Sequence, residues 1–117
     1  ELVVPKALAI GPKIQATFKK AYKAGVKIAF GSDAGVYPHG INGKEFGYMN
    51  EVGMPVMECI QSATITNALI LSMENDLGKI KEGFIADIVA TEDNPIDNIS
   101  TMENVVFVMK EGVVYKN

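Results

Sequence analysis

The sequence predicts an α/β fold that gives way, at about residue 78, to short antiparallel strands. Two observations lead to this fold class. A helical pattern, a glycine turn and a buried strand follow one another over residues 12–31, as in one half of an α/β unit. Further on, Glu111-Gly112 separates two β-branched runs, which predicts a hairpin. Neither half has the neighbouring strands that its layer needs, so we expect a piece of a larger fold or a chain that assembles with other copies.

The best-marked helix is predicted over residues 12–24, after a loop over residues 1–11. Apolar residues recur there at every fourth position, at Ile14, Phe18 and Tyr22. This spacing predicts one buried stripe and one solvated face. Gly25 ends the helix, and the apolar run 26–30 follows as a buried strand.

Two further helices are predicted over residues 44–52 and 55–73, the second with a break near Thr64. The later part of the chain is predicted to form strands over residues 86–90, 105–110 and 113–115, with a loop over residues 94–102. We therefore expect two units, residues 1–77 and residues 78–117.

Composition and charge limit the classes of protein. Of the 117 residues, 48% are hydrophobic, which excludes a disordered chain, and a net charge of −3 without basic clusters disfavours nucleic acid as a partner. No run approaches the roughly 20 apolar residues that cross a membrane, and no signal peptide is visible, so we expect a cytoplasmic protein without a membrane partner. The chain has one Cys and one His, so a metal site would have to be shared with residues outside this sequence.

Asp33 is the first candidate for chemistry. It comes three residues after the predicted strand and lies between two glycines, so its carboxylate can project at the strand's carboxyl end with little cover. A carboxylate there can bind a metal, or take a proton from a metal-bound water. Alternatively, Asp33 is a turn residue that bonds its own backbone.

Two neighbours of Asp33 are candidates for substrate contact. His39 can contact substrate, carry a proton or coordinate metal, or it can be an exposed loop histidine. Ser32 lacks the surroundings of a nucleophile, so we assign it a hydrogen-bonding role. Cys59 is expected in the core, and Glu45 on a solvated helix face near the His39 loop.

Several short motifs follow one another in a specific order. They are Gly25-Val26-Lys27-Ile28-Ala29-Phe30-Gly31-Ser32-Asp33-Ala34-Gly35, Pro38-His39-Gly40, Val52-Gly53-Met54-Pro55, Ser62-Ala63-Thr64 with Asn67-Ala68, Leu77-Gly78-Lys79-Ile80-Lys81-Glu82-Gly83, Ala86-Asp87-Ile88-Val89 and Asn94-Pro95. In this order they resemble the carboxyl-terminal part of the metal-dependent amidohydrolase superfamily, in the branch of imidazolonepropionase-like enzymes and Xaa-Pro dipeptidases. The resemblance covers nearly the whole chain from about Pro12 onward.

The resemblance implies a carboxyl-terminal fragment of a (β/α)₈ TIM barrel over residues 1–77, followed over residues 78–117 by strands of the family's β-sandwich. It implies that Asp33 is the eighth-strand aspartate, a metal ligand and catalytic base that orients a water molecule and accepts its proton. The metal would be a divalent ion, with zinc favoured. His39 and Ser32 would contact a small-molecule or dipeptide substrate.

The resemblance also implies that most metal ligands lie outside this chain, because the family's first-strand His-x-His pair, its carboxylated lysine and its later histidines are absent. We therefore expect an enzyme that hydrolyses a C–N bond, with an Xaa-Pro dipeptide among the possible substrates. The chain alone is expected to be inactive and to associate with the missing part of the barrel or with other copies. The rival hypothesis is a catalytically silent α/β module with Asp33 as a structural turn residue. Ser72 and Gly43 depart mildly from the family, where glycine and alanine respectively are more usual.

Overall fold

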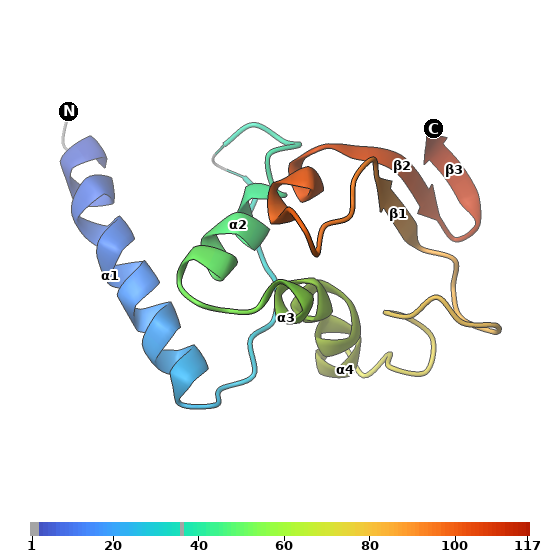
Figure 1. The fold of residues 1–117 in the computed structure, drawn as a ribbon, viewed down its shortest axis with the longest axis horizontal. Helices are drawn as coiled ribbons and strands as arrows, with labels where there is room; N and C mark the ends of the chain where they lie inside the picture. Colours follow the sequence, from blue (N-terminus) through green and yellow to red (C-terminus); the bar gives the residue numbers. More distant parts are fainter. Residues whose placement is uncertain (1–2, 36) are drawn as a thin grey trace.

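The structure, a computed structural model, describes residues 3–35 and 37–117, with side chains from residue 8 onward. It has a mixed helix and strand fold with one three-stranded antiparallel sheet in the order β1-β2-β3. Figure 1 shows α1 at one end, the short helices in the middle and the sheet at the other end. The elements are α1 (Val3–Lys23), α2 (Lys44–Glu51), α3 (Val56–Gln61), the π-helical turn η1 (Ser62–Thr66), α4 (Asn67–Ile70), β1 (Ile88–Thr91), the 3₁₀ helix η2 (Ile99–Glu103), β2 (Val105–Lys110) and β3 (Val113–Lys116).

Helix α1 begins earlier than the sequence predicted. Residues 3–11, expected as a loop, are helical, and Pro12 lies inside the helix. A proline removes one backbone hydrogen bond, but the other bonds of this 21-residue helix continue on both sides of it. The predicted buried stripe is covered only at its later end, because Phe18 and Tyr22 pack against the core whereas Ile14 is 62% exposed.

Residues 26–30 are extended, but within the described part of the chain they pair with no strand, so the predicted strand is not assigned. Their hydrogen bonds go to the helices instead. The backbone N–H of Phe30 donates to the carbonyl oxygen of Ser62 (3.2 Å), and the Asn67 side-chain amide donates to the carbonyl oxygen of Phe30 (3.0 Å). A strand becomes a ladder only when a second strand lies beside it, and the described part of this chain brings none to residues 26–30.

The core lies among the short helices in the middle of the molecule. Phe46 and Met49 of α2 pack with Met54 and Cys59, and the Phe30 ring stacks on Phe46 with the ring centroids 4.4 Å apart. Helix α2 begins where it was predicted and ends one residue earlier, since it covers Lys44–Glu51. Near Thr64, where a break was predicted, the helix widens into the π-helical turn η1 and continues into α4; no side chain caps a new start there, and the helix ends at Ile70 rather than at residue 73.

The sheet confirms the predicted hairpin. Strands β2 and β3 are joined by Glu111 and Gly112, whose φ angles of 51° and 79° are those of a tight turn that matches strand twist. Strand β1 pairs with the other side of β2. It begins two residues later than predicted. Every residue of β3 is exposed, so the sheet is covered by little of the described chain on that edge.

The predicted loop over residues 94–102 contains the 3₁₀ helix η2. The Asn98 side chain accepts a hydrogen bond from the backbone N–H of Ser100 and so caps this helix. Ile99 and Met102 pack against the core of the short helices. The later part of the chain therefore contacts the earlier part, while the division into units near residue 78 stays a prediction.

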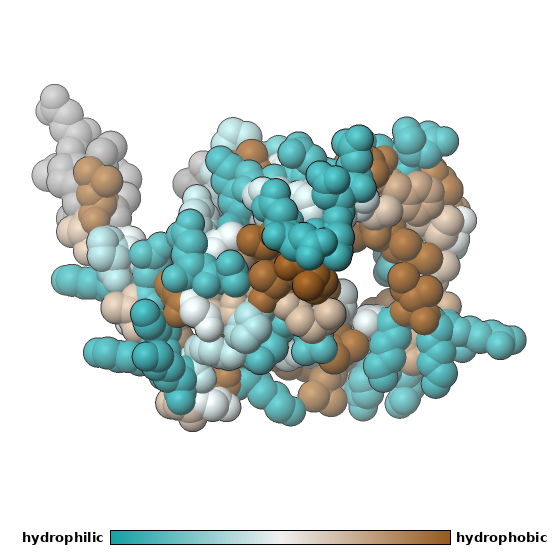
Figure 2. Space-filling view, viewed as in Figure 1, coloured by the Kyte–Doolittle hydropathy of each residue, from teal (hydrophilic) through white to brown (hydrophobic). Residues whose placement is uncertain are grey.

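Much apolar surface is left in contact with solvent. Figure 2 shows hydrophobic residues reaching the surface in the middle of the molecule and beside the sheet. Among the described side chains, Leu8 is 73% exposed, Leu71 64% and Ile80 86%. In the residues that the structure describes, no helix combines the length and apolar character needed to cross a membrane.

Candidate functional site

Asp33 follows the extended segment 26–30 and leaves it with a left-handed backbone. Its φ is 46°, which is uncommon for a residue with a side chain, and the residue is exposed. Within the described residues its carboxylate takes part in no hydrogen bond and no ion pair, so the backbone bond expected of a turn residue is not formed there. Both oxygens of Asp33 are therefore open to an external ligand or a proton.

The segment before Asp33 is anchored firmly. Both backbone polar groups of Phe30 are bonded to the helical layer, one to Ser62 and one to Asn67, and its ring is stacked on Phe46. From the sequence, Asn67 stands out only as part of the ordered motifs. Its role could not be predicted because it joins residues 37 positions apart.

Two residues that were not predicted from the sequence bind Ser32, one at its backbone and one at its side chain. The Tyr37 hydroxyl donates to the backbone carbonyl oxygen of Ser32 (2.6 Å), and the Asn42 amide donates to the Ser32 hydroxyl (3.2 Å). The other end of the Asn42 amide accepts a bond from the backbone N–H of Gly40 (3.3 Å). A polar loop rich in Gly and Asn was visible in the sequence, and Asn commonly makes such local bonds, but the partners were not evident.

His39 lies in the same loop as Asp33 and is exposed. Among the described residues no hydrogen bond joins it to Asp33 or to any other group. The fold thus places both residues in one loop, but it does not bring their side chains into contact.

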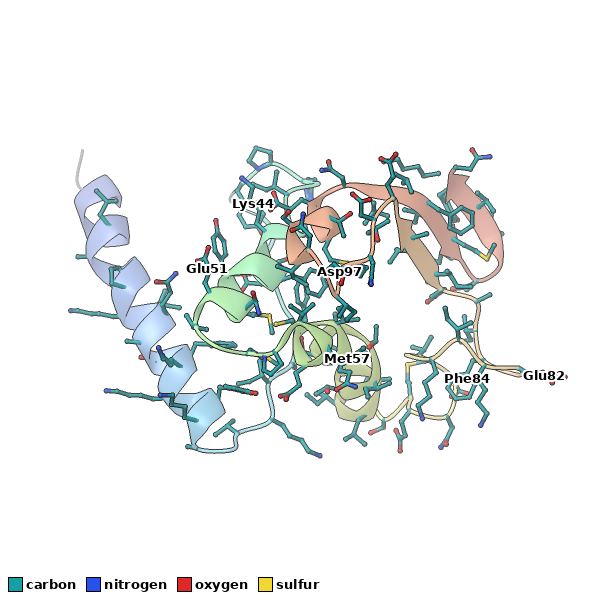
Figure 3. The ribbon with its side chains drawn as sticks, in the orientation of Figure 1. Lys44, Glu51, Met57, Glu82, Phe84 and Asp97 are labelled. Atoms are coloured by element: carbon teal, nitrogen blue, oxygen red, sulfur yellow. The ribbon has the colours of Figure 1, made fainter. Side chains whose placement is uncertain are left out.

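Glu45 lies on α2, directly after this loop. It is half-buried rather than fully solvated, and burial raises the pKa of its carboxyl above the ordinary value. Together with Ser32, Tyr37 and Asn42 it lines a small cavity of about 170 Å³. In Figure 3 the neighbouring Lys44 marks the start of α2, where the loop that carries Asp33 ends.

Cys59 occupies the core as the sequence predicted. It is 0% exposed, and burial raises the pKa of its thiol to about 11. A thiol in this state is protonated at neutral pH and is a poor nucleophile. Cys59 is therefore a packing residue.

The side chains available as ligands determine whether this part of the chain can bind a metal by itself. Within the described residues, no group of three or more His, Cys, Asp and Glu side chains lies close enough to bind one. An unpartnered carboxylate such as that of Asp33 is a suitable single oxygen ligand for a divalent ion. The residues present fit one ligand of a metal site, with the other ligands coming from elsewhere.

A comparison with known protein families decides what this chain is related to. The model of the "Amidohydrolase family" matches residues 3–115. The chain belongs to the amidohydrolase family. This family is generally metal-dependent.

Relatives of the chain include hydrolases with different substrates. It is 35% identical to the ochratoxinase of Aspergillus niger over 104 residues, 85% of this chain and 21% of that protein. A solved Xaa-Pro dipeptidase with methionine bound in its active site is 55% identical, with a TM-score of 0.90 over 97% of this chain and 28% of that one. A prolidase solved in complex with N-methylphosphonate-L-proline is 32% identical, with a TM-score of 0.85 over 97% of this chain and 29% of that one.

These relatives are all much longer than the chain, which spans between a fifth and a third of their lengths. Family and neighbours together indicate a hydrolase by resemblance. They agree with the family resemblance found from the ordered motifs.

Proposed function

We propose that this chain is part of a metal-dependent amidohydrolase that hydrolyses a C–N bond of an amide or peptide by means of an activated water molecule. The observation that carries the proposal is the carboxylate of Asp33, which is exposed and unpartnered among the described residues at the end of a segment anchored on both sides. A strained backbone at such a residue is typical of a functional position. Family membership supports the class of reaction.

The architecture that we propose is the terminal part of a (β/α)₈ barrel over residues 1–77 and strands of a β-sandwich over residues 78–117. The extended residues 26–30 would be the last barrel strand, with the missing neighbours on both sides. Exposed apolar residues on α1 and on the sheet support a larger assembly, because such surface is normally covered. We propose that the rest of the barrel, or other copies of the chain, covers it.

The metal, for which zinc is favoured, would polarise the substrate carbonyl and lower the pKa of a bound water. Asp33 would be its one ligand from this chain. As the water oxygen bonds to the carbonyl carbon, the Asp33 carboxylate accepts the proton that the water loses. As the C–N bond breaks, Asp33 returns that proton to the leaving nitrogen, so protons balance over the reaction.

The substrate that we favour is an Xaa-Pro dipeptide, because the solved Xaa-Pro dipeptidase is 55% identical to this chain. His39 and Ser32 are proposed as substrate contacts. The His39 side chain is exposed in the loop that follows Asp33, where it is free to meet a bound molecule. The 35% identity to an ochratoxinase makes a bulkier amide the second candidate.

The proposal is tested in the intact protein, meaning the polypeptide that carries this chain. Asp33→Ala is expected to lower the turnover of Xaa-Pro dipeptides by about 10³-fold or more, a loss typical of removing a catalytic group, while the protein still folds. The matched control is Asp93→Ala, since Asp93 is also exposed but lies near the sheet. Unchanged turnover in Asp33→Ala would leave the rival hypothesis, a silent module with Asp33 as a turn residue.

A further inference from the structure

The Ser32–Asp33 peptide group is fixed from outside the segment that contains it. The carbonyl oxygen of Ser32 belongs to the same planar unit as the backbone nitrogen of Asp33, and it accepts the 2.6 Å hydrogen bond from the Tyr37 hydroxyl. Rotation about the next bond, from that nitrogen to the Cα of Asp33, is the angle φ. The hydrogen bond from Tyr37 therefore holds the Ser32–Asp33 peptide plane, and the φ of 46° describes how Asp33 is rotated relative to that plane.

That backbone conformation has a cost which its surroundings must offset. A left-handed residue with a side chain is disfavoured by about 1–2 kcal/mol, and such conformations persist where neighbouring contacts determine them. Without the Tyr37 bond, Asp33 could relax to an ordinary φ, and its carboxylate would then point in a different direction.

Asn42 restrains the same unit through its side chain. Its amide nitrogen donates to the Ser32 hydroxyl, and its amide oxygen accepts from the backbone N–H of Gly40. Asn42 lies two residues before the start of α2, so it ties Ser32 to the helical layer. Tyr37 and Asn42 thus act on the backbone and on the side chain of one residue, directly before Asp33.

We infer that Tyr37 and Asn42 are positioning residues that aim the Asp33 carboxylate at the reacting atoms. The inference rests on the proposed function, and it assigns a role to two residues that touch neither substrate nor metal in it. Groups that orient a metal ligand typically contribute 10–100-fold to activity. A displacement of about 1 Å at a reacting group is enough for such a loss.

The test is the isosteric variant Tyr37→Phe in the intact protein, assayed on Xaa-Pro dipeptides. We expect kcat to fall 10–100-fold with KM changed less than about threefold, because the affected group acts on the chemical step. Asn42→Ala is expected to lower kcat as well, and also to change KM, because Asn42 binds the hydroxyl of Ser32, a proposed substrate contact. Tyr115→Phe is the matched control, since Tyr115 lies on β3 and is 71% exposed.

Repeating Tyr37→Phe in the Asp33→Glu variant distinguishes a positioning role of Tyr37 from a general structural role. In Asp33→Glu the carboxylate is already displaced by one methylene, so adding Tyr37→Phe is expected to cost less than about threefold. Equal losses in both backgrounds, or a loss confined to KM, would overturn the inference, as would an unchanged kcat in Tyr37→Phe. If Asp33→Ala itself keeps full turnover, the proposed function fails; if only Tyr37→Phe and Asn42→Ala keep it, the positioning role fails alone.

Discussion

Among the residues that the structure describes, three with side chains adopt a left-handed backbone, and they differ in what holds them there: Asp33, Ser72 and Glu111. Glu111 is in the hairpin turn, where the adjoining strands require this conformation. Asp33 follows a peptide group fixed by Tyr37. Ser72 follows the last residues of α4, at the place where helices commonly end in glycine.

Replacing Ser72 by glycine is expected to stabilise the intact protein. Glycine adopts the φ of 57° without strain, and the gain should be about 0.5–1 kcal/mol after the greater freedom of glycine in the unfolded chain is counted. The matched control is Ser72→Ala, which keeps the Cβ and should give no gain. Denaturant unfolding measures both variants, and equal stabilities would contradict the argument.

Cys59 should make stability depend on pH in the alkaline range. Burial raises the pKa of its thiol to about 11, above the value of about 8.5 in an unfolded chain. The neutral thiol therefore contributes fully below about pH 8.5, and its contribution is lost as the pH rises toward 11. We expect the wild type to lose up to about 3 kcal/mol relative to Cys59→Ala across this range. A stability difference between the two proteins that stays constant from pH 8 to 10.5 would contradict a buried thiol.

At the scale of elements, the contact between α2 and η2 joins the early and late parts of the chain. Gly43, directly before α2, lies against the backbone of Met102, so closely that a Cβ at Gly43 would overlap the carbonyl group of Met102. The φ of Gly43 is −59°, an ordinary helical value, so only this close approach requires glycine.

Gly43→Ala is therefore expected to destabilise the intact protein by about 1–3 kcal/mol, the usual cost of forcing extra volume into a packed contact. Gly47→Ala is the control, because Gly47 lies inside α2 and a Cβ there would meet no described atom within 4 Å, so alanine should add up to about 1 kcal/mol of helix stability. Thermal denaturation compares the two. A neutral Gly43→Ala would contradict the argument and mean that η2 shifts easily.

Elements that depend on their own sequence were predictable, and features that depend on contacts with other parts of the chain were not. The hairpin follows from Glu111-Gly112, and the end of α2 follows from Gly53, which closes it. The strand at residues 26–30 has an apolar sequence, but a ladder depends on a partner strand that the described part of this chain does not supply. The anchors of the candidate site, Tyr37, Asn42 and Asn67, were missed because their hydrogen bonds join residues five to 37 positions apart.

At the scale of the whole molecule, the chain is more open than a self-contained domain of its size. Its accessible surface is 8464 Å², whereas a folded monomer of 12.6 kDa has about 6,200 Å². Its radius of gyration is 15.6 Å, against about 13 Å for a compact domain of this length. The excess agrees with the exposed apolar residues along α1 and the sheet.

The isolated 117-residue chain is expected to associate with itself, because its apolar faces have no other cover. Light scattering should report masses above 12.6 kDa that grow with concentration. Leu8→Lys on the exposed part of α1 should reduce this association, whereas Lys19→Arg, an exposed change on the same helix that preserves charge, should not. A clean monomer at high concentration would contradict the expectation and favour a self-sufficient module.

The amount of metal that the isolated chain retains distinguishes a metal site shared with other polypeptide from one that this chain forms alone. Asp33 is the single site ligand that we assign to the chain, and one carboxylate does not hold a zinc ion tightly without further ligands. After incubation with zinc and removal of the excess, the isolated chain should retain well under one ion per chain, and Asp33→Asn should retain the same amount. The intact protein, treated in parallel, should retain its metal, and there Asp33→Asn should weaken retention. Tight stoichiometric binding by the isolated chain would overturn the shared site, because the ligands would then have to lie within these 117 residues.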